Sequence, residues 1–514
     1  MFKPAAIFSD HMVLQRGKRI CVFGKGESGS QITVKLFLEG EADLSSARAI
    51  CREGRWTAYL PEREAAAGLI MEITDGTETI RYQDIVIGEV WLAGGQSNME
   101  LELQNALGGQ ELLENGTAEG VDYTGVRFYY TPKLAYRDEH YEEETDKSCW
   151  ELFDREAAAK WSAVGVYFAG MLSAKLGVTV GIVGCNWGGT SASCWMSREA
   201  LLEQEATRCY VEDYESSDCI KKPEAEQIRE YKEYQIYQED WDKRAAAVYE
   251  KEPMIPFDEI QQRIGPCQYP GPMNCANFTR PFGLYETMLR QVCPYTLRGF
   301  LFYQGESDED RADRYYALFG RMISQWREDW QEPSLPFLMV QLPMHRYQHD
   351  SDTRSWCLIR ESQMKVYQTL RNTGIAVAID CGQFHEIHPR NKKPVGERLA
   401  LQALAQIYGS IPKSQAFGPV YRDFLYRDGG MELFFDYAEE GMYFRDGCQE
   451  GFELAGPDGV FYPAKAELEG NKIFLRSAGV EEPVMARYLW TNYGEVSVFG
   501  ANHLPMAPFR THKF

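Results

Sequence analysis

The sequence predicts an α/β fold with a parallel central sheet covered by helices on both faces, and smaller β-rich regions on either side. Between about residues 87 and 410, near-continuous apolar runs of strand length alternate with stretches whose apolar residues recur at helical spacing. Strands that are buried on both faces give this pattern, because helices cover both sides of a parallel sheet. Before and after this region, short apolar runs between glycine-rich turns indicate β structure instead.

A chain of 514 residues is too long for one hydrophobic core, and we expect three domains. Residues 1–86 predict an N-terminal antiparallel β-sandwich, 87–410 the α/β domain, and 411–514 a C-terminal β-rich domain. The elements expected in the α/β domain are a helix at 164–176, a strand at 178–184, a strand at 297–303, a helix at 315–330, and strands at 335–342 and 373–380.

The α/β region contains an insertion at about 198–265 with a different composition. Its stretch 224–252 is charged and rich in tyrosine, and predicts a long solvated helix or a helical hairpin. We interpret the insertion as a lid, a spacer or an oligomer contact, so a homodimer is one expected partner arrangement.

Charge and cysteine usage restrict the class of protein. The net charge of −22 makes nucleic acid and anionic membrane surfaces unfavourable partners. The N-terminus has no sustained apolar stretch, and no run elsewhere approaches 18 apolar residues, so we expect neither a signal peptide nor a membrane span. The 13 cysteines are scattered without a Cys-x2-Cys pair, which favours reduced thiols in a cytoplasmic protein.

The stretch 87–99, I-G-E-V-W-L-A-G-G-Q-S-N-M, is the first candidate for chemistry. An apolar strand ends there at Gly94 and Gly95, and Ser97 follows. Glycines permit a sharp turn at a strand end, and such a turn exposes the serine hydroxyl as a nucleophile. Because Met99 stands where a second elbow glycine is usual, the other strand ends must support the interpretation.

Four predicted strands end in polar, glycine-rich sequence, at 94–98, 186–191, 303–308 and 382–389. The carboxyl ends of parallel strands meet at one edge of a sheet, where ligands bind. A serine hydrolase needs a nucleophile, a base, a group that orients the base, and oxyanion donors. The backbone N–H of Gly188 or Gly189 and the amide of Gln304 are candidate oxyanion donors. His388, with Glu386 beside it, is the candidate base.

Several motifs together resemble the sialate O-acetylesterase family, a branch of the SGNH hydrolases. They are D-H-M-V-L-Q-R at 10–16, I-G-E-V-W-L-A-G-G-Q-S-N-M at 87–99, W-G-G-T-S at 187–191, F-Y-Q-G-E-S-D at 302–308, I-H-P-R-N-K at 387–392 and V-G-E-R-L-A at 395–400. The resemblance implies an SGNH-type three-layer α/β/α sandwich. It also implies a carbohydrate O-acetylesterase that removes acetyl groups from sialic acid or plant-derived acetylated oligosaccharides through a serine acetyl-enzyme, without a cofactor or metal.

Carried over residue by residue, the resemblance implies that Ser97 is the nucleophile and His388 the base. Gly188, Gln304 and the backbone N–H of Ser97 would form the oxyanion hole. The family usually places an aspartate two residues before the histidine, where this chain has Glu386. Glu386 is therefore the expected orienting acid, and a Ser-His dyad assisted by a backbone carbonyl is the alternative.

Two other functions stay open on sequence grounds. One is a carbohydrate-binding protein with a decayed hydrolase site. The other is a metal-dependent N-deacetylase, for which His345 and His349, four positions apart, are the nearest approach to a ligand pair. A proline lies beside them in a polar stretch, and we interpret both histidines as surface residues rather than as a metal site.

Overall fold

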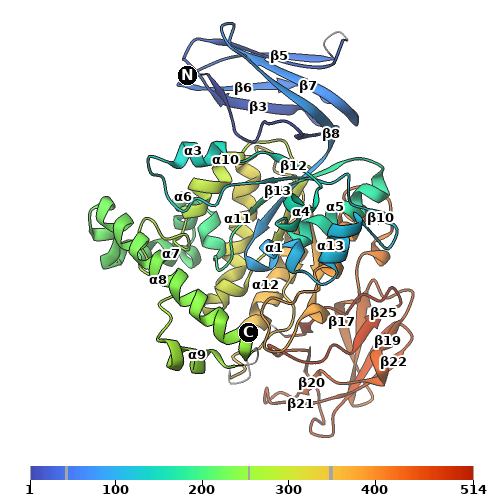
Figure 1. The fold of residues 1–514 in the computed structure, drawn as a ribbon. Helices are drawn as coiled ribbons and strands as arrows, with labels where there is room; N and C mark the ends of the chain where they lie inside the picture. The colour runs from blue at the N-terminus through green and yellow to red at the C-terminus, as the bar shows by residue number, and fades with distance from the viewer. Residues whose placement is uncertain (1, 41–43, 253–254, 347–350, 513–514) are drawn as a thin grey trace.

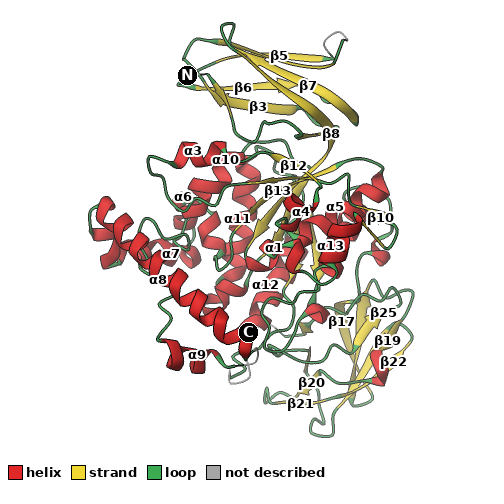
Figure 2. Ribbon diagram, in the orientation of Figure 1, coloured by secondary structure: helices red, strands yellow, loops and turns green. Residues whose placement is uncertain are grey.

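A computed structural model describes residues 2–40, 44–252, 255–346 and 351–512. Its centre is a mixed sheet with the strand order β12-β11-β13-β8-β14-β15-β16. This sheet lies in the middle of the molecule, between the N-terminal strands and the C-terminal β region (Figures 1 and 2). Neighbours from β11 to β16 pair in parallel, and β12 is antiparallel at the edge. The bounds are β12 (Trp150–Leu152), β11 (Arg127–Tyr130), β13 (Val180–Asn186), β8 (Thr79–Gly95), β14 (Gly299–Tyr303), β15 (Phe337–Gln341) and β16 (Thr373–Val377).

Helices cover both faces of this sheet. In β8, Trp91 contacts Phe168 of one helix, with ring centroids 5.2 Å apart. A Cβ built on Gly94 would lie 3.0 Å from the ring of Trp326 on another helix. Residues three apart in a strand point to opposite faces, so these two helices lie on opposite sides. The pairs that pack together are α5 (Ala163–Leu176) with α13 (Lys393–Gln406), and α11 (Tyr315–Asp329) with α12 (Ser355–Thr369).

The N-terminal region forms two layers of strands above the central sheet (Figure 1). One layer is β1-β3-β6; in the other, β4 pairs with β5 and β7, and β7 pairs with β8. The pairing departs from the all-antiparallel arrangement expected, because β2 runs parallel to β8. The bounds are β1 (Lys3–Pro4), β2 (Val13–Gln15), β3 (Ile20–Lys25), β4 (Gln31–Leu38), β5 (Ser45–Ile50), β6 (Arg55–Leu60) and β7 (Ala66–Thr74).

Strand β8 belongs to both the N-terminal layer and the central sheet. It runs through position 86, where the sequence suggests a domain boundary, without a break. A buried carboxylate fastens it there: Glu89 accepts hydrogen bonds from Gln15 at 3.0 Å, Arg16 at 2.6 Å and Arg298 at 2.8 Å. Burial raises the pKa of Glu89, but the two guanidinium groups more than offset this and the pKa is lowered overall.

The C-terminal region is built from antiparallel strands. Two four-stranded sheets, β17-β18-β23-β22 and β21-β20-β24-β26, lie beside the small pair β19-β25. The bounds are β17 (Val420–Arg427), β18 (Gly430–Asp436), β19 (Met442–Phe444), β20 (Phe452–Ala455), β21 (Phe461–Pro463), β22 (Lys465–Glu469), β23 (Lys472–Arg476), β24 (Met485–Tyr488), β25 (Val498–Gly500) and β26 (Phe509–Arg510).

The insertion is helical and lies to one side of the central domain (Figure 2). Its helices are α6 (Arg198–Leu202), α7 (Glu205–Ser216), α8 (Glu224–Lys251) and α9 (Phe257–Ile264). The remaining short elements are α1 (Ser97–Glu100), α2 (Gly109–Asn115), β9 (Thr117–Ala118), β10 (Val121–Asp122), α3 (Tyr141–Asp146), α4 (Arg155–Ala159) and α10 (Arg290–Val292). Within the described residues, none of the helices combines the length and the apolar character needed to cross a bilayer.

Candidate active site

The turn that follows β8 presents Ser97 at the carboxyl edge of the sheet. The strand ends at Gly95, which has φ +133 and whose added Cβ would lie 2.1 Å from the carbonyl oxygen of Tyr303. Only glycine fits this position, because both the backbone conformation and the neighbouring strand exclude a side chain. Helix α1 begins at Ser97, and the serine is only partly buried.

The structure brings His388 to this serine from a loop 291 residues away in the sequence. His388 Nε2 lies 2.8 Å from Ser97 Oγ, within hydrogen-bonding distance. Burial lowers the pKa of His388, while the carboxylate of Glu386 raises it, and the net shift is downward. The imidazole is therefore neutral at neutral pH, the state in which Nε2 accepts a proton from a hydroxyl.

Glu386 lies beside His388 but holds its backbone rather than its ring. The carboxylate oxygen Oε1 accepts a hydrogen bond from the backbone N–H of His388 at 2.7 Å. The same oxygen is 3.9 Å from Nδ1, an ion-pair distance that is too long for a hydrogen bond. The carboxylate thus holds the loop at His388 and does not hydrogen-bond to the imidazole, as the expected orienting acid would.

Gly188 lies directly against the serine. A Cβ built on Gly188 would be 3.2 Å from Ser97 Cβ. Its backbone N–H donates to Oε2 of Glu100 at 2.6 Å, and Oε1 of Glu100 accepts from Lys133 Nζ at 2.5 Å. The N–H expected to bind a substrate oxyanion thus donates to a carboxylate of the protein itself.

Gln304 is buried at the end of β14, and its side chain is fully engaged. The amide Nε2 donates to Asp308 at 2.6 Å and to the carbonyl oxygen of Thr190 at 3.2 Å, and the amide oxygen accepts from Tyr315 at 2.9 Å. An amide carries two N–H donors, and both have acceptors here. A substrate oxyanion would have to displace one of these acceptors, so this geometry lends no support to the expected donor role.

Sequence reasoning assigned no role to Asn98, which forms the centre of a buried network beneath the serine. Its amide donates to Glu306 at 2.6 Å and to the carbonyl oxygen of Ile387 at 2.9 Å, and its oxygen accepts from Lys392. Burial lowers the pKa of Lys392 to about 8 and raises that of Glu306. Asn98, Glu306, Ile387 and Lys392 all lie within the motifs quoted above. Membership of these motifs was the sequence feature that could have pointed to a shared site.

The described residues contain no group of three or more His, Cys, Asp or Glu side chains placed to hold a metal ion. Of the histidine pair considered from the sequence, His345 is 4% exposed rather than a surface residue. His349 lies outside the described residues.

Known proteins resemble this chain over much of its length. Residues 266–405 match the family of carbohydrate esterases described as sialic acid-specific acetylesterase. The chain is 26% identical to mouse (Mus musculus) sialate O-acetylesterase, covering 99% of this chain and 94% of that protein. It is 25% identical to the human (Homo sapiens) sialate O-acetylesterase, covering 79% and 71%. Among solved structures, a carbohydrate acetylesterase from Xanthomonas citri superposes over 100% of both chains with a TM-score of 0.76 and 27% identity.

Proposed function

We propose that this chain, which is similar to sialate O-acetylesterases and to a solved carbohydrate acetylesterase, is a carbohydrate O-acetylesterase that acts through a serine acetyl-enzyme. The observation that carries the proposal is the 2.8 Å contact between His388 Nε2 and Ser97 Oγ. A hydroxyl held against a neutral imidazole is the arrangement of an activated nucleophile. The proposal includes an SGNH-type α/β/α architecture, which the parallel strands and the two helix layers support.

The proposed reaction has two steps. In the first, His388 takes the proton of the Ser97 hydroxyl while Oγ attacks the acetyl carbonyl carbon. The tetrahedral intermediate collapses, the C–O bond to the sugar breaks, and His388 returns the proton to the departing sugar oxygen. In the second, His388 takes a proton from water, the resulting hydroxide attacks the acetyl-enzyme, and Ser97 leaves with that proton while acetate is released.

We assign the oxyanion contact first to the backbone N–H of Gly188. Its position against Ser97 Cβ and its bond to a carboxylate oxygen of Glu100 indicate a donor accessible to an anion. Substrate binding then requires Glu100 to turn away from Gly188, and its existing ion pair with Lys133 offers an alternative partner. The backbone N–H of Ser97 is a further proposed donor, and Gln304 would contribute only after exchanging an acceptor.

The substrate class that we propose is an acetylated sialic acid or an acetylated oligosaccharide in a cytoplasmic, reducing setting. All 13 cysteines are free in the structure, which fits a reducing compartment. The negative net charge of −22 weighs against long polyanionic substrates.

The decisive experiment measures acetate release from acetylated sugars by the wild type, Ser97→Ala and His388→Ala. We expect each substitution to reduce kcat by several orders of magnitude while circular dichroism stays unchanged, since neither side chain is part of the core. Ser216→Ala is the control, because this serine is exposed at the end of helix α7, away from the four strand ends, and donates to the carbonyl oxygen of Asp213. Acetate release by Ser97→Ala at the wild-type rate would refute the nucleophile assignment. Loss of activity with a chelator would instead indicate the metal-dependent alternative.

A further inference from the structure

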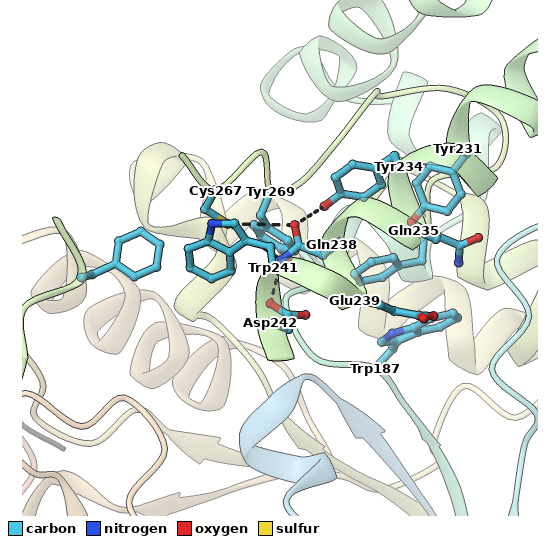
Figure 3. Close-up of a pocket in the computed structure, with 12 residues that line it drawn as sticks. Trp187, Tyr231, Tyr234, Gln235, Gln238, Glu239, Trp241, Asp242, Cys267 and Tyr269 are labelled. Carbon is cyan, nitrogen blue, oxygen red and sulfur yellow. Dashed lines mark hydrogen bonds between the residues drawn. The ribbon is translucent and has the colours of Figure 1, made fainter. Parts of the chain in front are cut away.

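A cavity of about 540 Å³ lies between the insertion and the central domain (Figure 3). We call it the insertion pocket. Its volume falls in the range of small-molecule binding sites. The lining residues are Trp187, Tyr231, Tyr234, Gln235, Gln238, Glu239, Trp241, Asp242, Phe257, Cys267, Tyr269 and Phe278.

One wall of the insertion pocket is a single face of helix α8. The lining residues of this helix fall at 231, 234, 235, 238, 239, 241 and 242, at the three- and four-residue spacing of one helix face. Hydrogen bonds hold this face in place: Trp241 Nε1 donates to the carbonyl oxygen of Gly265 at 2.9 Å, and Gln238 accepts from Tyr234 at 3.2 Å and donates to Asp242 at 2.8 Å. The wall is therefore formed before any ligand arrives.

The opposite wall joins the insertion pocket to the candidate active site. Trp187 lines the pocket and precedes Gly188, whose added Cβ would lie 3.2 Å from Ser97 Cβ. Tyr269 lines the pocket as well, and its hydroxyl donates to the carbonyl oxygen of Gly189 at 3.3 Å. A molecule bound in the pocket therefore lies next to a group that reacts at Ser97.

The chemistry of the lining selects for a neutral, polyhydroxylated ligand. Aromatic rings bind the apolar faces of such a molecule, and Tyr269 keeps 49% of its surface exposed for that contact. Gln235, Glu239 and Asp242 supply amide and carboxylate groups for hydroxyl hydrogen bonds. The described lining contains two carboxylates and neither Lys nor Arg. An anionic sugar would lack a positive partner there and would be repelled.

Lys133 approaches this lining at Trp187, with Nζ 5.8 Å from the centre of the ring. Its charge is already paired with Glu100 at 2.5 Å. The lysine thus compensates the Glu100 carboxylate at the active site and does not make the pocket attractive to an anion.

We propose that the insertion pocket binds a neutral sugar unit of an acetylated oligosaccharide, adjacent to the unit whose acetyl group reacts at Ser97. The inference rests on the proposed esterase function and makes it more specific: this chain favours neutral oligosaccharides over single sialic acids. It also gives the insertion a binding role that its charged sequence did not suggest.

The test separates binding from catalysis. Full-length Ser97→Ala is titrated by calorimetry with unacetylated xylotetraose, mannotetraose and N-acetylneuraminic acid. We expect at least one neutral tetrasaccharide to bind and N-acetylneuraminic acid not to bind. Adding Trp241→Ala should weaken that binding about tenfold or more, as truncation of an aromatic anchor does. Ile236→Ala is the matched control, because Ile236 lies on the same helix, is 71% exposed and does not line the pocket.

Tyr269→Ala replaces Trp241→Ala as the test variant if the latter does not fold, since Tyr269 is half exposed outside any helix. Binding of neither neutral sugar, equal binding of N-acetylneuraminic acid, or full binding by the folded pocket variant would each overturn the inference. In a separate arm, wild-type acetate release is compared between acetylated xylotetraose and acetylated xylose. A higher kcat/KM for the longer substrate supports the pocket, and equal values oppose it. Absence of acetate release from every ester would contradict the esterase proposal, while the titrations still test the pocket.

Discussion

Replacing Asn98 with alanine should damage stability and catalysis together. The Asn98 side chain has three partners: the buried side chains of Glu306 and Lys392, and the carbonyl oxygen of the partly buried Ile387. Each partner left unsatisfied costs about 1 kcal/mol or more, and two of them are ionisable groups. We therefore expect the free energy of unfolding to fall by about 3 kcal/mol or more, which is about 1 kcal/mol or more for each of the three partners.

The bond to the Ile387 carbonyl also positions the residue that precedes His388, so its loss displaces the imidazole from Ser97. A displacement of about 1 Å is enough to lower kcat about 100-fold. Urea unfolding and acetate release measured on Asn98→Ala test both effects. Asn105→Ala is the matched control, because Asn105 is an exposed asparagine nearby in sequence that donates to Glu102. A variant within about 0.5 kcal/mol of the wild type, the usual range for surface substitutions, and with unchanged kcat would refute this reasoning.

Four further outcomes are expected. Activity should decline as the pH falls through the pKa of His388, because the protonated ring cannot accept the serine proton. Burial lowers this pKa below its ordinary value of 6.5, so a pH–rate profile whose acid limb lies above 6.5 would contradict the assignment. Glu386→Gln should lower kcat only modestly if the carboxylate acts through the His388 backbone N–H, whereas a loss of about 10⁴-fold would indicate a triad acid. Gln304→Ala should lower kcat about 100- to 1000-fold if the amide exchanges its acceptors to bind the oxyanion. If the amide keeps those acceptors, the substitution should lower stability and leave kcat nearly unchanged. The pKa of Glu89 is lower in the folded state than in the unfolded state, so its ionised carboxylate stabilises the fold at pH values above the unfolded-state pKa. This stabilisation is lost as the pH falls through the folded-state pKa. The thermal unfolding temperature of Glu89→Gln should therefore depend less on pH in acid than that of the wild type.

The sequence predicts the α/β layers and the approach of Ser97 to His388 for the same reason. Parallel strands place their carboxyl ends on one edge, so polar residues that follow β8 and β16 lie on the same edge although they are far apart in the chain. The loop after β16 then carries His388 across the ends of β15 and β14 to Ser97. The detailed roles around them depend on side-chain directions that motifs do not encode. The carboxylate of Glu386 binds a backbone N–H, and the amide of Gln304 points its donors at Asp308 and Thr190.

The continuity of β8 and the pocket-lining face of α8 could not be predicted from the sequence, because both depend on segments that are distant in the chain. The sequence places a domain boundary at position 86, which lies inside strand β8. The buried carboxylate of Glu89 in this strand is explained by Gln15, Arg16 and Arg298, which other segments bring to it. In α8, tyrosine, glutamine and tryptophan at helical spacing have both polar and apolar parts, so the face that lines a cavity resembles a solvated one. The surrounding chain, not local spacing, decides both cases.

The length of β8 has a mechanical consequence. The strand is clamped by neighbours at both ends, with β7 and β2 on the N-terminal side and β13 and β14 on the other. If β8 slipped by one residue, each of its side chains would point to the wrong face in both layers. The pairing in the N-terminal layer therefore also fixes the position of Gly94 and Gly95 at the far end of the strand. The pairing in the N-terminal layer thus helps to set the position of Ser97, and we expect a change that loosens this layer to shift Ser97 relative to His388.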